Sequence, residues 1–189
     1  MRVIAGKARG VRLSSVPGTD TRPTLDRVKE ALFNILQTWV PGSDFLDLFA
    51  GNGGIGIEAL SRGARHAVFV DLKPQCTRMI RANLQAAKVD GAQVLTMPVE
   101  RALERLAKAG SQFDIIFLDP PYGRQLVGKT LAALEGYDLL RPGGLVVAEY
   151  GAKEEIDLGT SKFERVRQEK YGDTALGFFT LREDERECE

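Results

Sequence analysis

Short apolar runs alternate with longer amphipathic stretches through most of this chain of 189 residues. The apolar runs are rich in Val, Ile, Leu and Phe and are bounded by polar or glycine-containing turns, which is typical of buried parallel strands. The expected strands are 45–50, 67–71, 93–97, 113–118 and 144–150, and the expected helices are 57–62, 74–87, 100–108 and 129–135. This alternation predicts an α/β fold in which helices cover both faces of a mostly parallel sheet.

The C-terminal part departs from this alternation. Two strand-like runs, 163–167 and 176–181, are connected through Gly172 and Asp173, so we expect a hairpin. With 43% hydrophobic residues, the chain is long enough for one well-buried core but short of two full domains. We therefore expect a single domain, 1–189. It would comprise an N-terminal arm and helix (1–40), a catalytic core (41–182) and a charged tail (183–189).

The tetrapeptide Asp119-Pro120-Pro121-Tyr122 directly follows the expected strand 113–118. It therefore lies at the carboxyl end of a strand, where open α/β sheets bind their ligands. The two prolines fix the backbone and remove two N–H donors, so the turn offers carbonyl oxygens. Together with the Asp119 carboxylate they suit a planar exocyclic amine whose ring stacks on Tyr122. The alternative is that Asp-Pro-Pro forms only a stiff strand-to-loop turn.

An aryl amine is a poor nucleophile because its lone pair is delocalised into the ring. Acceptors on its two hydrogens favour a tetrahedral nitrogen and stabilise the positive charge that develops during attack, which is preorganised electrostatic catalysis. Stacking on Tyr122 would hold the base in line with the transferred group.

A glycine-rich loop, Gly51-Asn52-Gly53-Gly54-Ile55-Gly56, separates the expected strand 45–50 from a helix. Asp71 ends the next expected strand, twenty positions after Gly51. This is the fingerprint of a dinucleotide site, with the acid on a ribose hydroxyl. A nicotinamide-dependent dehydrogenase is therefore one interpretation.

Three features favour S-adenosylmethionine as the cofactor. Asp47 lies beside the glycine turn, where a carboxylate would repel a pyrophosphate but attract a sulfonium and an ammonium. No substrate domain or hydride-transfer acid or base is recognisable, and the one histidine, His66, stands in an expected turn. Finally, the Asp119–Tyr122 turn has a use beside a methyl donor and none beside a nicotinamide.

Charge is informative only locally. Lys plus Arg and Asp plus Glu both total 26, so the chain is formally neutral, unlike a dedicated nucleic-acid binder. Residues 1–30 carry seven basic and three acidic side chains, or +4, and the tail from Arg182 carries about −3 (two minus five). The basic segment suits phosphate contacts beside the active site, although it could be only a solvated face. The candidates for such contacts are Lys7, Arg9, Arg12, Arg22, Arg27 and Arg124.

Within the first forty residues, 3–4 and 11–13 predict a small hairpin, which we interpret as an arm. A helix is expected from Leu25 to about Gln37, with Thr24 as its N-cap, and we interpret it as a cover over the cofactor. Its apolar positions, Leu25, Val28, Leu32 and Leu36, form an ordinary core stripe.

The sequence resembles a known family over nearly its whole length, the bacterial 16S ribosomal RNA guanine-N2 methyltransferases of the D type (the RsmD family). The residues that carry the resemblance are Ile4-Ala5-Gly6, Arg9-Gly10, the block from Arg22-Pro23-Thr24 to Leu36, Leu46–Gly51, Gly56–Ala64 and Asp119–Tyr122. The Arg-Pro-Thr block is the most specific of them, since many amino-group methyltransferases share the glycine loop and the Pro-Pro-Tyr turn.

The resemblance implies a Rossmann-like class I methyltransferase with a seven-stranded sheet whose last strand is antiparallel. It implies methylation of the N2 amine of one guanine in 16S ribosomal RNA, with Asp119, Pro120, Pro121 and Tyr122 at the catalytic centre. The expected S-adenosylmethionine contacts are Asp47, Phe49, Ala50, Gly51, Gly53, Gly56, Asp71, Leu72, Val99 and Glu100. No metal is required. Where relatives tend to carry an acid at the adenine-binding turn, this chain has Met97-Pro98-Val99-Glu100, so either Glu100 or backbone groups around Val99 would contact the adenine.

Three other functions stay open. A DNA amino-methyltransferase would usually need a target-recognition domain, and a protein glutamine methyltransferase would have asparagine in place of Asp119. A non-catalytic RNA-binding protein would tolerate the loss of Asp119.

Cys76 and Cys188 are too few and too scattered for a disulfide framework or a metal site. No apolar stretch approaches membrane length and no signal peptide is recognisable, so we expect a cytoplasmic enzyme. Nothing in the sequence suggests an obligate partner chain, so we expect a monomer. Its partner would be ribosomal RNA within the small ribosomal subunit or an assembly intermediate.

Overall fold

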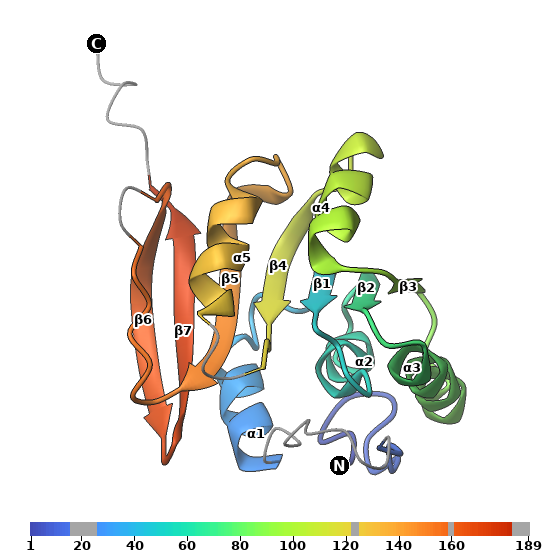
Figure 1. Ribbon diagram of the computed structural model, residues 1–189. Coiled ribbons are helices and arrows are strands. Elements are labelled where there is room, and N and C mark those ends of the chain that lie inside the picture. Colours follow the sequence, from blue (N-terminus) through green and yellow to red (C-terminus); the bar gives the residue numbers. More distant parts are fainter. Residues whose placement is uncertain (16–25, 122–124, 159–160, 183–189) are drawn as a thin grey trace.

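The computed structural model describes residues 1–15, 26–121, 125–158 and 161–182. The strands form one sheet in the order β3-β2-β1-β4-β5-β7-β6 (Figure 1). The strands are β1 (Asp44–Leu48), β2 (His66–Asp71), β3 (Ala92–Thr96), β4 (Phe113–Leu118), β5 (Leu140–Gly151), β6 (Phe163–Tyr171) and β7 (Thr174–Leu181). The helices are α1 (Asp26–Ile35), α2 (Gly54–Ser61), α3 (Pro74–Ala87), α4 (Val99–Lys108) and α5 (Leu126–Leu134).

The five strands β1 to β5 pair in parallel, whereas β7 runs antiparallel to both β5 and β6. The predicted α/β fold, the C-terminal hairpin and the antiparallel last strand are all confirmed. An all-parallel dinucleotide fold would have the strand order 3-2-1-4-5-6. The inserted antiparallel strand is therefore the first structural observation against the dehydrogenase interpretation.

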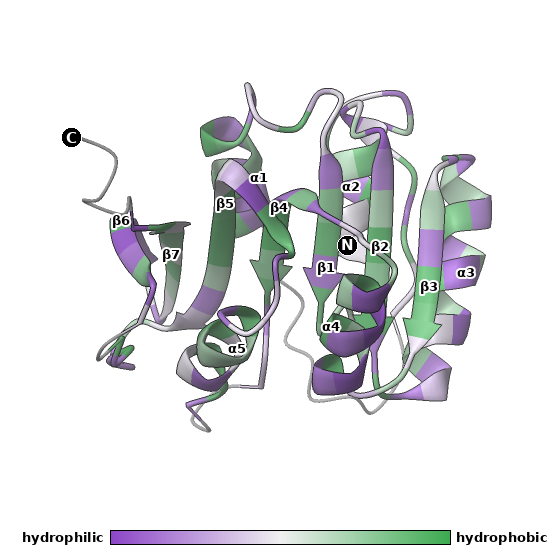
Figure 2. Cartoon of the chain, turned by 90° about the horizontal axis from the view of Figure 1, so that it is seen from above, coloured by the Kyte–Doolittle hydropathy of each residue, from purple (hydrophilic) through white to green (hydrophobic). Residues whose placement is uncertain are grey.

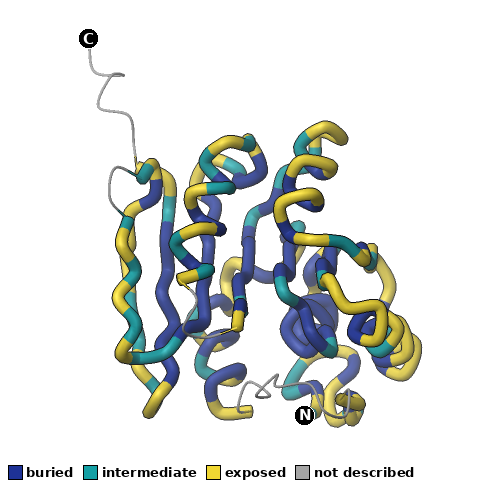
Figure 3. The backbone as a smooth tube through the Cα atoms, viewed as in Figure 1, coloured by how far each residue is buried: buried dark blue, intermediate teal, exposed yellow. Residues whose placement is uncertain are grey.

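Two apolar layers sandwich the sheet, one on each face. One contains Phe45, Phe69 and Phe117 with side chains of α1, α2 and α3, and the other contains Leu46, Leu48 and Leu118 with side chains of α4 and α5. Seen from above, α1 and α2 lie in the upper part of the picture and α4 and α5 in its lower part (Figure 2). Consecutive residues of a strand point to opposite faces, so the β-branched and aromatic residues fill both layers. The central strands are accordingly largely buried, as is α2 (Figure 3).

Several boundaries differ from the sequence prediction. α3 has the expected limits because Pro74 favours the first turn of a helix and Lys88, at φ 51°, ends it. α2 begins at Gly54, inside the glycine motif and before the predicted start at residue 57, because packing against neighbouring side chains compensates for the low helix propensity of glycine. β5 begins at Leu140 and α5 at Leu126, both earlier than predicted.

The N-terminal segment, residues 1–15, folds back as predicted but is not a free arm. Arg2 and Arg12 form an antiparallel bridge, and the Val3 N–H donates to the Val11 carbonyl at 2.9 Å. Val3 and Leu13 are buried in the same core layer as α1 and α2. The segment is therefore docked on the body of the protein, which the sequence interpretation missed.

The predicted core stripe of the first helix is confirmed for Val28, Leu32 and Leu36, all of which are buried. Leu25 and the proposed N-cap Thr24 lie outside the described residues. Among the described residues, no helix combines the length and apolarity that crossing a bilayer would require.

An ion-pair network joins the amino ends of three strands, opposite the edge where ligands are expected. The Arg141 guanidinium on β5 contacts Oδ2 of Asp44 on β1 at 2.6 Å and Oδ2 of Asp114 on β4 at 2.5 Å. Arg65 also pairs with Asp44, and the Asp44 N–H donates to Asp114 at 2.7 Å. Burial alone would raise the pKa of Asp44, but hydrogen bonds from Arg65 and Arg141 outweigh it and lower the pKa.

We expect Arg141→Met to lower the free energy of unfolding by about 1 kcal/mol at neutral pH, since the network is partly exposed to water. Because the pKa of Asp44 is lowered in the folded protein, the contribution of the network is present above the ordinary aspartate pKa and is lost as the pH falls through the folded pKa. Urea unfolding at neutral and acidic pH measures both effects. Lys108→Met, which breaks the exposed Lys108–Glu104 pair, is the control and should change nothing measurable. An equal loss in the two variants would contradict this assignment.

Candidate active site

The glycine loop begins with a left-handed turn at the carboxyl end of β1. Phe49 has φ 61°, followed by Gly51 at φ 56° and Gly53 at φ 80°. A bulky residue such as Phe49 rarely adopts a positive φ, and such strain persists only where the surrounding structure holds it. This turn carries the chain from the strand directly into α2.

Close packing accounts for the glycine at position 56. A Cβ at Gly56 would lie 2.3 Å from the ring of Phe69 on β2. Only glycine therefore allows the first turn of α2 to approach the sheet this closely.

The backbone amides of the loop are already engaged inside the protein. The Gly51 N–H donates to Oδ2 of Asp71 and the Gly56 N–H donates to Oδ2 of Asp47, both at 2.9 Å. The Gly53 N–H donates to the Ala50 carbonyl at 2.7 Å, and the Gly54 N–H donates to Oδ1 of Asn52 at 3.1 Å. A dinucleotide site instead points such amides at a pyrophosphate. Together with the antiparallel β7, the engagement of these four amides argues against the dehydrogenase interpretation.

Asp47, the β1 residue that accepts a hydrogen bond from the glycine loop, is deeply buried, with 2% of its surface exposed. Burial raises its pKa to about 7; the hydrogen bond from Gly56 opposes that shift, and the charge of Asp71 adds to it. A buried carboxylate of this kind is stabilised in its ionised form by a cationic ligand. The site therefore favours a ligand with positive charge near the glycine loop.

Asp71 lies at the end of β2, where its carboxylate links two neighbouring turns. Oδ2 accepts from the Gly51 N–H, and Oδ1 accepts from the Lys73 N–H at 2.8 Å. These bonds fix the carboxylate while each oxygen keeps acceptor capacity for a hydroxyl group. Leu72, the next residue, is 63% exposed, which leaves an apolar side chain available beside this acid.

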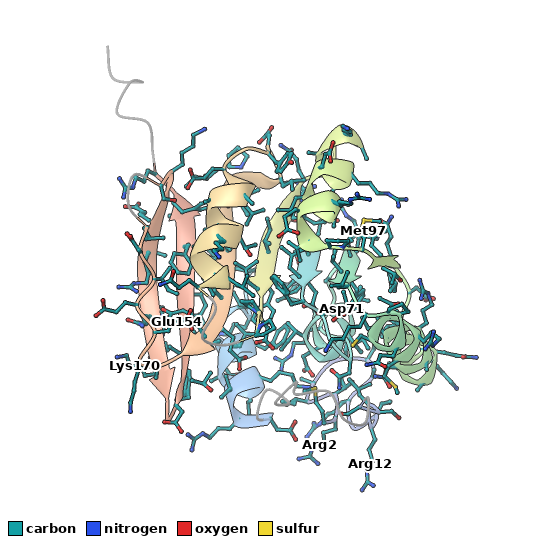
Figure 4. All side chains as sticks on the ribbon, viewed as in Figure 1. Arg2, Arg12, Asp71, Met97, Glu154 and Lys170 are labelled. Atoms are coloured by element: carbon teal, nitrogen blue, oxygen red, sulfur yellow. The ribbon has the colours of Figure 1, made fainter. Side chains whose placement is uncertain are left out.

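The turn after β3 carries the expected adenine contacts. The Met97 N–H donates to the Asp71 carbonyl at 3.2 Å, so this turn is tied to the end of β2; Asp71 and Met97 are labelled in Figure 4. Val99 begins α4 and is buried, whereas Glu100 is exposed in the first turn of that helix. Which of them contacts an adenine stays a prediction.

The predicted catalytic turn follows β4, next to the glycine loop. The Asp119 N–H donates to the Leu48 carbonyl of β1 at 3.4 Å, which joins the two turns. Asp119 is partly exposed as a whole residue, although its carboxyl group is buried, while Pro120 is buried and Pro121 is exposed. Tyr122 and Arg124 lie outside the described residues, so the predicted stacking and phosphate contacts stay predictions.

A third acid, Glu149 on β5, lies beside this turn, and the sequence analysis did not identify it. The register that pairs Leu118 with Ala148 places Glu149 next to Asp119. Strand alternation puts both on the sheet face of Asp47, since Phe45, Phe117 and Val147 share one core layer. Burial of the carboxyl group raises the pKa of Asp119 well above its usual range, and the charges of Glu149 and Asp47 raise it further. The sequence feature that could have identified Glu149 is the presence of one acid inside the apolar run 145–150.

These residues fit S-adenosylmethionine. Asp47 and Asp119 carry buried carboxyl groups that a positively charged ligand would keep ionised, and the contact of Asp71 with ribose hydroxyls stays a prediction. Among the described residues, no group of three or more His, Cys, Asp or Glu side chains could hold a metal ion.

A family model described as "Conserved hypothetical protein 95" matches residues 1–180. The chain belongs to this family. It is 41% identical to "Putative rRNA methyltransferase YlbH" of Bacillus subtilis over 183 residues, covering 96% of this chain and 100% of that protein. It is 31% identical to "Ribosomal RNA small subunit methyltransferase D" of Escherichia coli K12 over 179 residues, covering 95% and 89%.

Among solved structures, "Putative methyltransferase yhhF from Escherichia coli" matches with a TM-score of 0.80 and 32% identity, covering 96% of this chain and 97% of that chain. The family resemblance inferred from the sequence is confirmed, and so is the Rossmann-like methyltransferase fold. This member of the family is a methyltransferase.

In this methyltransferase, the basic candidates fall into two groups. Lys7, Arg9, Arg12 and Arg27 are exposed, while Arg22 lies outside the described residues. Lys29, which the sequence analysis counted in the basic segment, is fully buried, with Nζ 3.3 Å from Oε2 of Glu58. Lys29 therefore has a structural role, and the local charge available for phosphates is one unit lower than predicted.

The raised pKa of Asp47 predicts that cofactor affinity depends on pH. A cationic cofactor needs the carboxylate, so binding releases the proton that Asp47 holds below about pH 7. We expect the affinity for S-adenosylmethionine to weaken about tenfold from pH 8 to pH 6 and to level off at higher pH. The Asp47→Asn variant should bind S-adenosylmethionine more weakly than the wild type at both pH 6 and pH 8, and its affinity should no longer depend on pH. Isothermal titration calorimetry measures the cofactor affinity of the wild type and of the variant at each pH.

The same variant provides its own folding control. The folded protein holds the Asp47 proton more tightly than the unfolded chain does, so the ionised carboxylate destabilises the fold as the pH rises from about 4 to 7. Without cofactor, Asp47→Asn should therefore melt at or above the wild-type temperature at pH 8. A wild-type affinity that is constant from pH 6 to pH 8 would contradict this role of Asp47.

Proposed function

We propose that this enzyme transfers a methyl group from S-adenosylmethionine to the exocyclic N2 amine of a guanine in 16S ribosomal RNA. The observation that carries the proposal is the Asp119 turn, which stands beside the glycine loop and next to Glu149. Support for the RNA comes from relatives in Bacillus subtilis and Escherichia coli whose names specify ribosomal RNA as their substrate. The substrate would be the small ribosomal subunit or an assembly intermediate, and the enzyme would act as a cytoplasmic monomer.

S-adenosylmethionine, when bound, supplies an electrophilic methyl group. Asp47 would face its cationic methionine part, and the Asp71 carboxylate would accept from the ribose hydroxyls. The expected adenine contacts are Val99 or Glu100 with Leu72. These assignments follow from the positions of the residues at the carboxyl ends of β1, β2 and β3.

On the substrate side, Asp119 and the Pro120 carbonyl would accept hydrogen bonds from the two amine hydrogens, and Tyr122 would stack on the ring. These acceptors would hold the amine with its nitrogen lone pair directed at the methyl group that the cofactor supplies. The positive charge that forms on nitrogen is stabilised by the Asp119 carboxylate. The product ammonium is acidic, so its proton can leave after transfer.

The pair of acids favours guanine over the other amino-bearing bases. Guanine presents two adjacent donors, N1–H and N2–H₂, whereas the ring nitrogen next to the amine of adenine or cytosine is an acceptor. A second carboxylate beside Asp119 attracts the N1–H of guanine and repels such a ring nitrogen. Since N2 takes part in base pairing, the guanine must be presented unpaired or flipped.

Asp119→Ala should reduce methyl transfer by about 10²–10³-fold, because it removes the main acceptor for the developing charge. Cofactor binding should persist, since Asp47 and Asp71 stay in place. The assay follows labelled methyl into small ribosomal subunits from a strain that lacks the native guanine-N2 enzyme. Naked ribosomal RNA, DNA and a protein fraction serve as parallel substrates. Asp138→Ala is a matched control, because Asp138 is an exposed aspartate that accepts a surface hydrogen bond from Gln112.

Label recovered as N2-methylguanine in the 16S RNA, and lost in Asp119→Ala alone, is the expected result. Label found only in DNA or protein would contradict ribosomal RNA as the substrate, and full activity of Asp119→Ala would contradict the catalytic role of Asp119. No transfer to any substrate, together with no cofactor binding, would refute the methyltransferase function.

A further inference from the structure

Two sequence blocks that the catalytic site does not use meet in the structure. One is 4–8 in the N-terminal segment, and the other is 58–62 at the end of α2. The Glu58 carboxylate accepts from the Ile4 N–H at 2.8 Å and from the Ala5 N–H at 3.0 Å. These are backbone contacts, so they fix the path of the segment regardless of the side chains that it carries.

Ser61, one turn further along α2, makes three more contacts with the same segment. Its hydroxyl donates to the Ala5 carbonyl at 2.6 Å and accepts from the Ala8 N–H at 3.0 Å. Its own carbonyl accepts from the Lys7 N–H at 2.8 Å. Hydrogen bonds to α2 therefore hold four of the five residues from Ile4 to Ala8.

Glu58 is fully buried and is the centre of a charged cluster. Arg62 Nε contacts its carboxylate at 2.8 Å, and Lys29 Nζ lies 3.3 Å from it. Lys29 also donates to the Arg2 carbonyl at 2.6 Å. A buried carboxylate and a buried ammonium stabilise each other only in this geometry, so the pair connects α1, α2 and the N-terminal segment at defined positions.

Gly6 is the residue that allows the close approach. It has φ +82°, and a Cβ there would lie 1.9 Å from the carbonyl oxygen of Ser61. Gly10 has a similar φ of +86°, but a Cβ there would meet nothing within 4 Å. Both glycines satisfy the turn, but only Gly6 is required for docking on α2.

The other end of the segment contacts the cofactor loop. The Ser14 N–H donates to Oδ1 of Asn83 at 2.9 Å, and Nδ2 of Asn83 donates to the carbonyls of Ser14 and Asn52 at 3.0 and 2.9 Å. Met1 lies against Gly54, since a Cβ on this glycine would be 2.2 Å from the methionine sulfur. The segment is thus attached beside the glycine loop at both ends.

The charges of the segment all face outward. Residues 1–15 contain no acid, and their four basic side chains are exposed while Val3, Ala8 and Leu13 are buried beneath them. In Figure 4, Arg2 and Arg12 point away from the body of the protein. The four are Arg2, Lys7, Arg9 and Arg12. An outward array of this kind suits the phosphates of a nucleic-acid backbone.

We propose that Glu58 and Ser61 are positioning residues, which hold segment 1–15 as a fixed RNA-contact surface beside the cofactor loop, with Gly6 permitting the docking. The inference rests on the proposed function for the identity of the RNA. A docked segment keeps its cations in one arrangement and loses little conformational entropy when RNA binds. Glu58 and Ser61 are buried, so they would act through the segment that they hold and not by contact with the RNA.

The test compares Gly6→Ala with Gly10→Ala. Both place alanine at a positive φ, but only Gly6→Ala forces the segment off α2. We expect Gly6→Ala to raise the KM and the Kd for 16S ribosomal RNA about tenfold and to reduce the salt dependence of binding, because phosphate contacts are lost. kcat and cofactor affinity should stay within about twofold, and Gly10→Ala should resemble the wild type.

Ser61→Ala is the milder second variant in case Gly6→Ala folds poorly. It removes only the hydroxyl, and we expect it to weaken RNA binding in the same direction, by about threefold, at unchanged kcat. RNA affinity and its salt dependence are measured without methyl transfer. A wild type that binds the RNA but does not methylate it therefore refutes the proposed function and leaves this comparison intact. Equal RNA affinity in Gly6→Ala and the wild type, or a change confined to kcat, would overturn the inference.

Discussion

The hydrogen bond between the Asp47 carboxylate and the Gly56 amide is the interaction on which the active site depends. It joins β1 to the first turn of α2 across the glycine loop, and it holds a carboxylate beside the turn where a dinucleotide fold would bind a pyrophosphate. The bond also keeps an acid in the protein interior, where its pKa rises to about 7. A single contact thus shapes the loop and sets the sign of charge that the site accepts.

The acids at the carboxyl edge impose a cost on the protein without ligand. Asp47, Asp119 and Glu149 share one face of the sheet, and their mutual repulsion and burial raise the pKa of Asp119. Functional sites often carry destabilising groups of this kind, because the ligand supplies the missing interaction. At the opposite edge, Arg141 and Arg65 pair with Asp44 and Asp114, so acids at the amino ends of the strands are compensated within the protein itself.

Much of this architecture could be predicted from the sequence. The strand and helix order, the limits of α3 and the proximity of Asp47 to the glycine loop follow from local patterns, because buried strands and amphipathic helices have recognisable periods. The Asp119 turn was found because prolines and an acid directly follow an apolar run. Its packing against the Leu48 carbonyl depends on sheet order, which local patterns do not specify.

The parts that escaped prediction depend on tertiary partners. Lys29 was counted as a surface charge, although its spacing from Leu32 and Leu36 places it on the buried face of α1. The reason is that its ion-pair partner, Glu58, lies 29 positions away in the sequence. The docking of the N-terminal segment on α2 depends on Ser61 and Glu58 in the same way. Glu149 lies in an apolar run, and its position next to Asp119 depends on the register between β5 and β4, which the sequence does not reveal.

The most direct test of the central claim, that the acids at this edge select a cationic cofactor over a dinucleotide, is a calorimetric titration of the protein with S-adenosylmethionine and, separately, with NAD⁺. We predict saturable binding of S-adenosylmethionine and none of NAD⁺ at the same concentrations, since the amides of the glycine loop are engaged and Asp47 repels phosphate. Binding of NAD⁺ with comparable affinity, or failure to bind S-adenosylmethionine, would contradict the account.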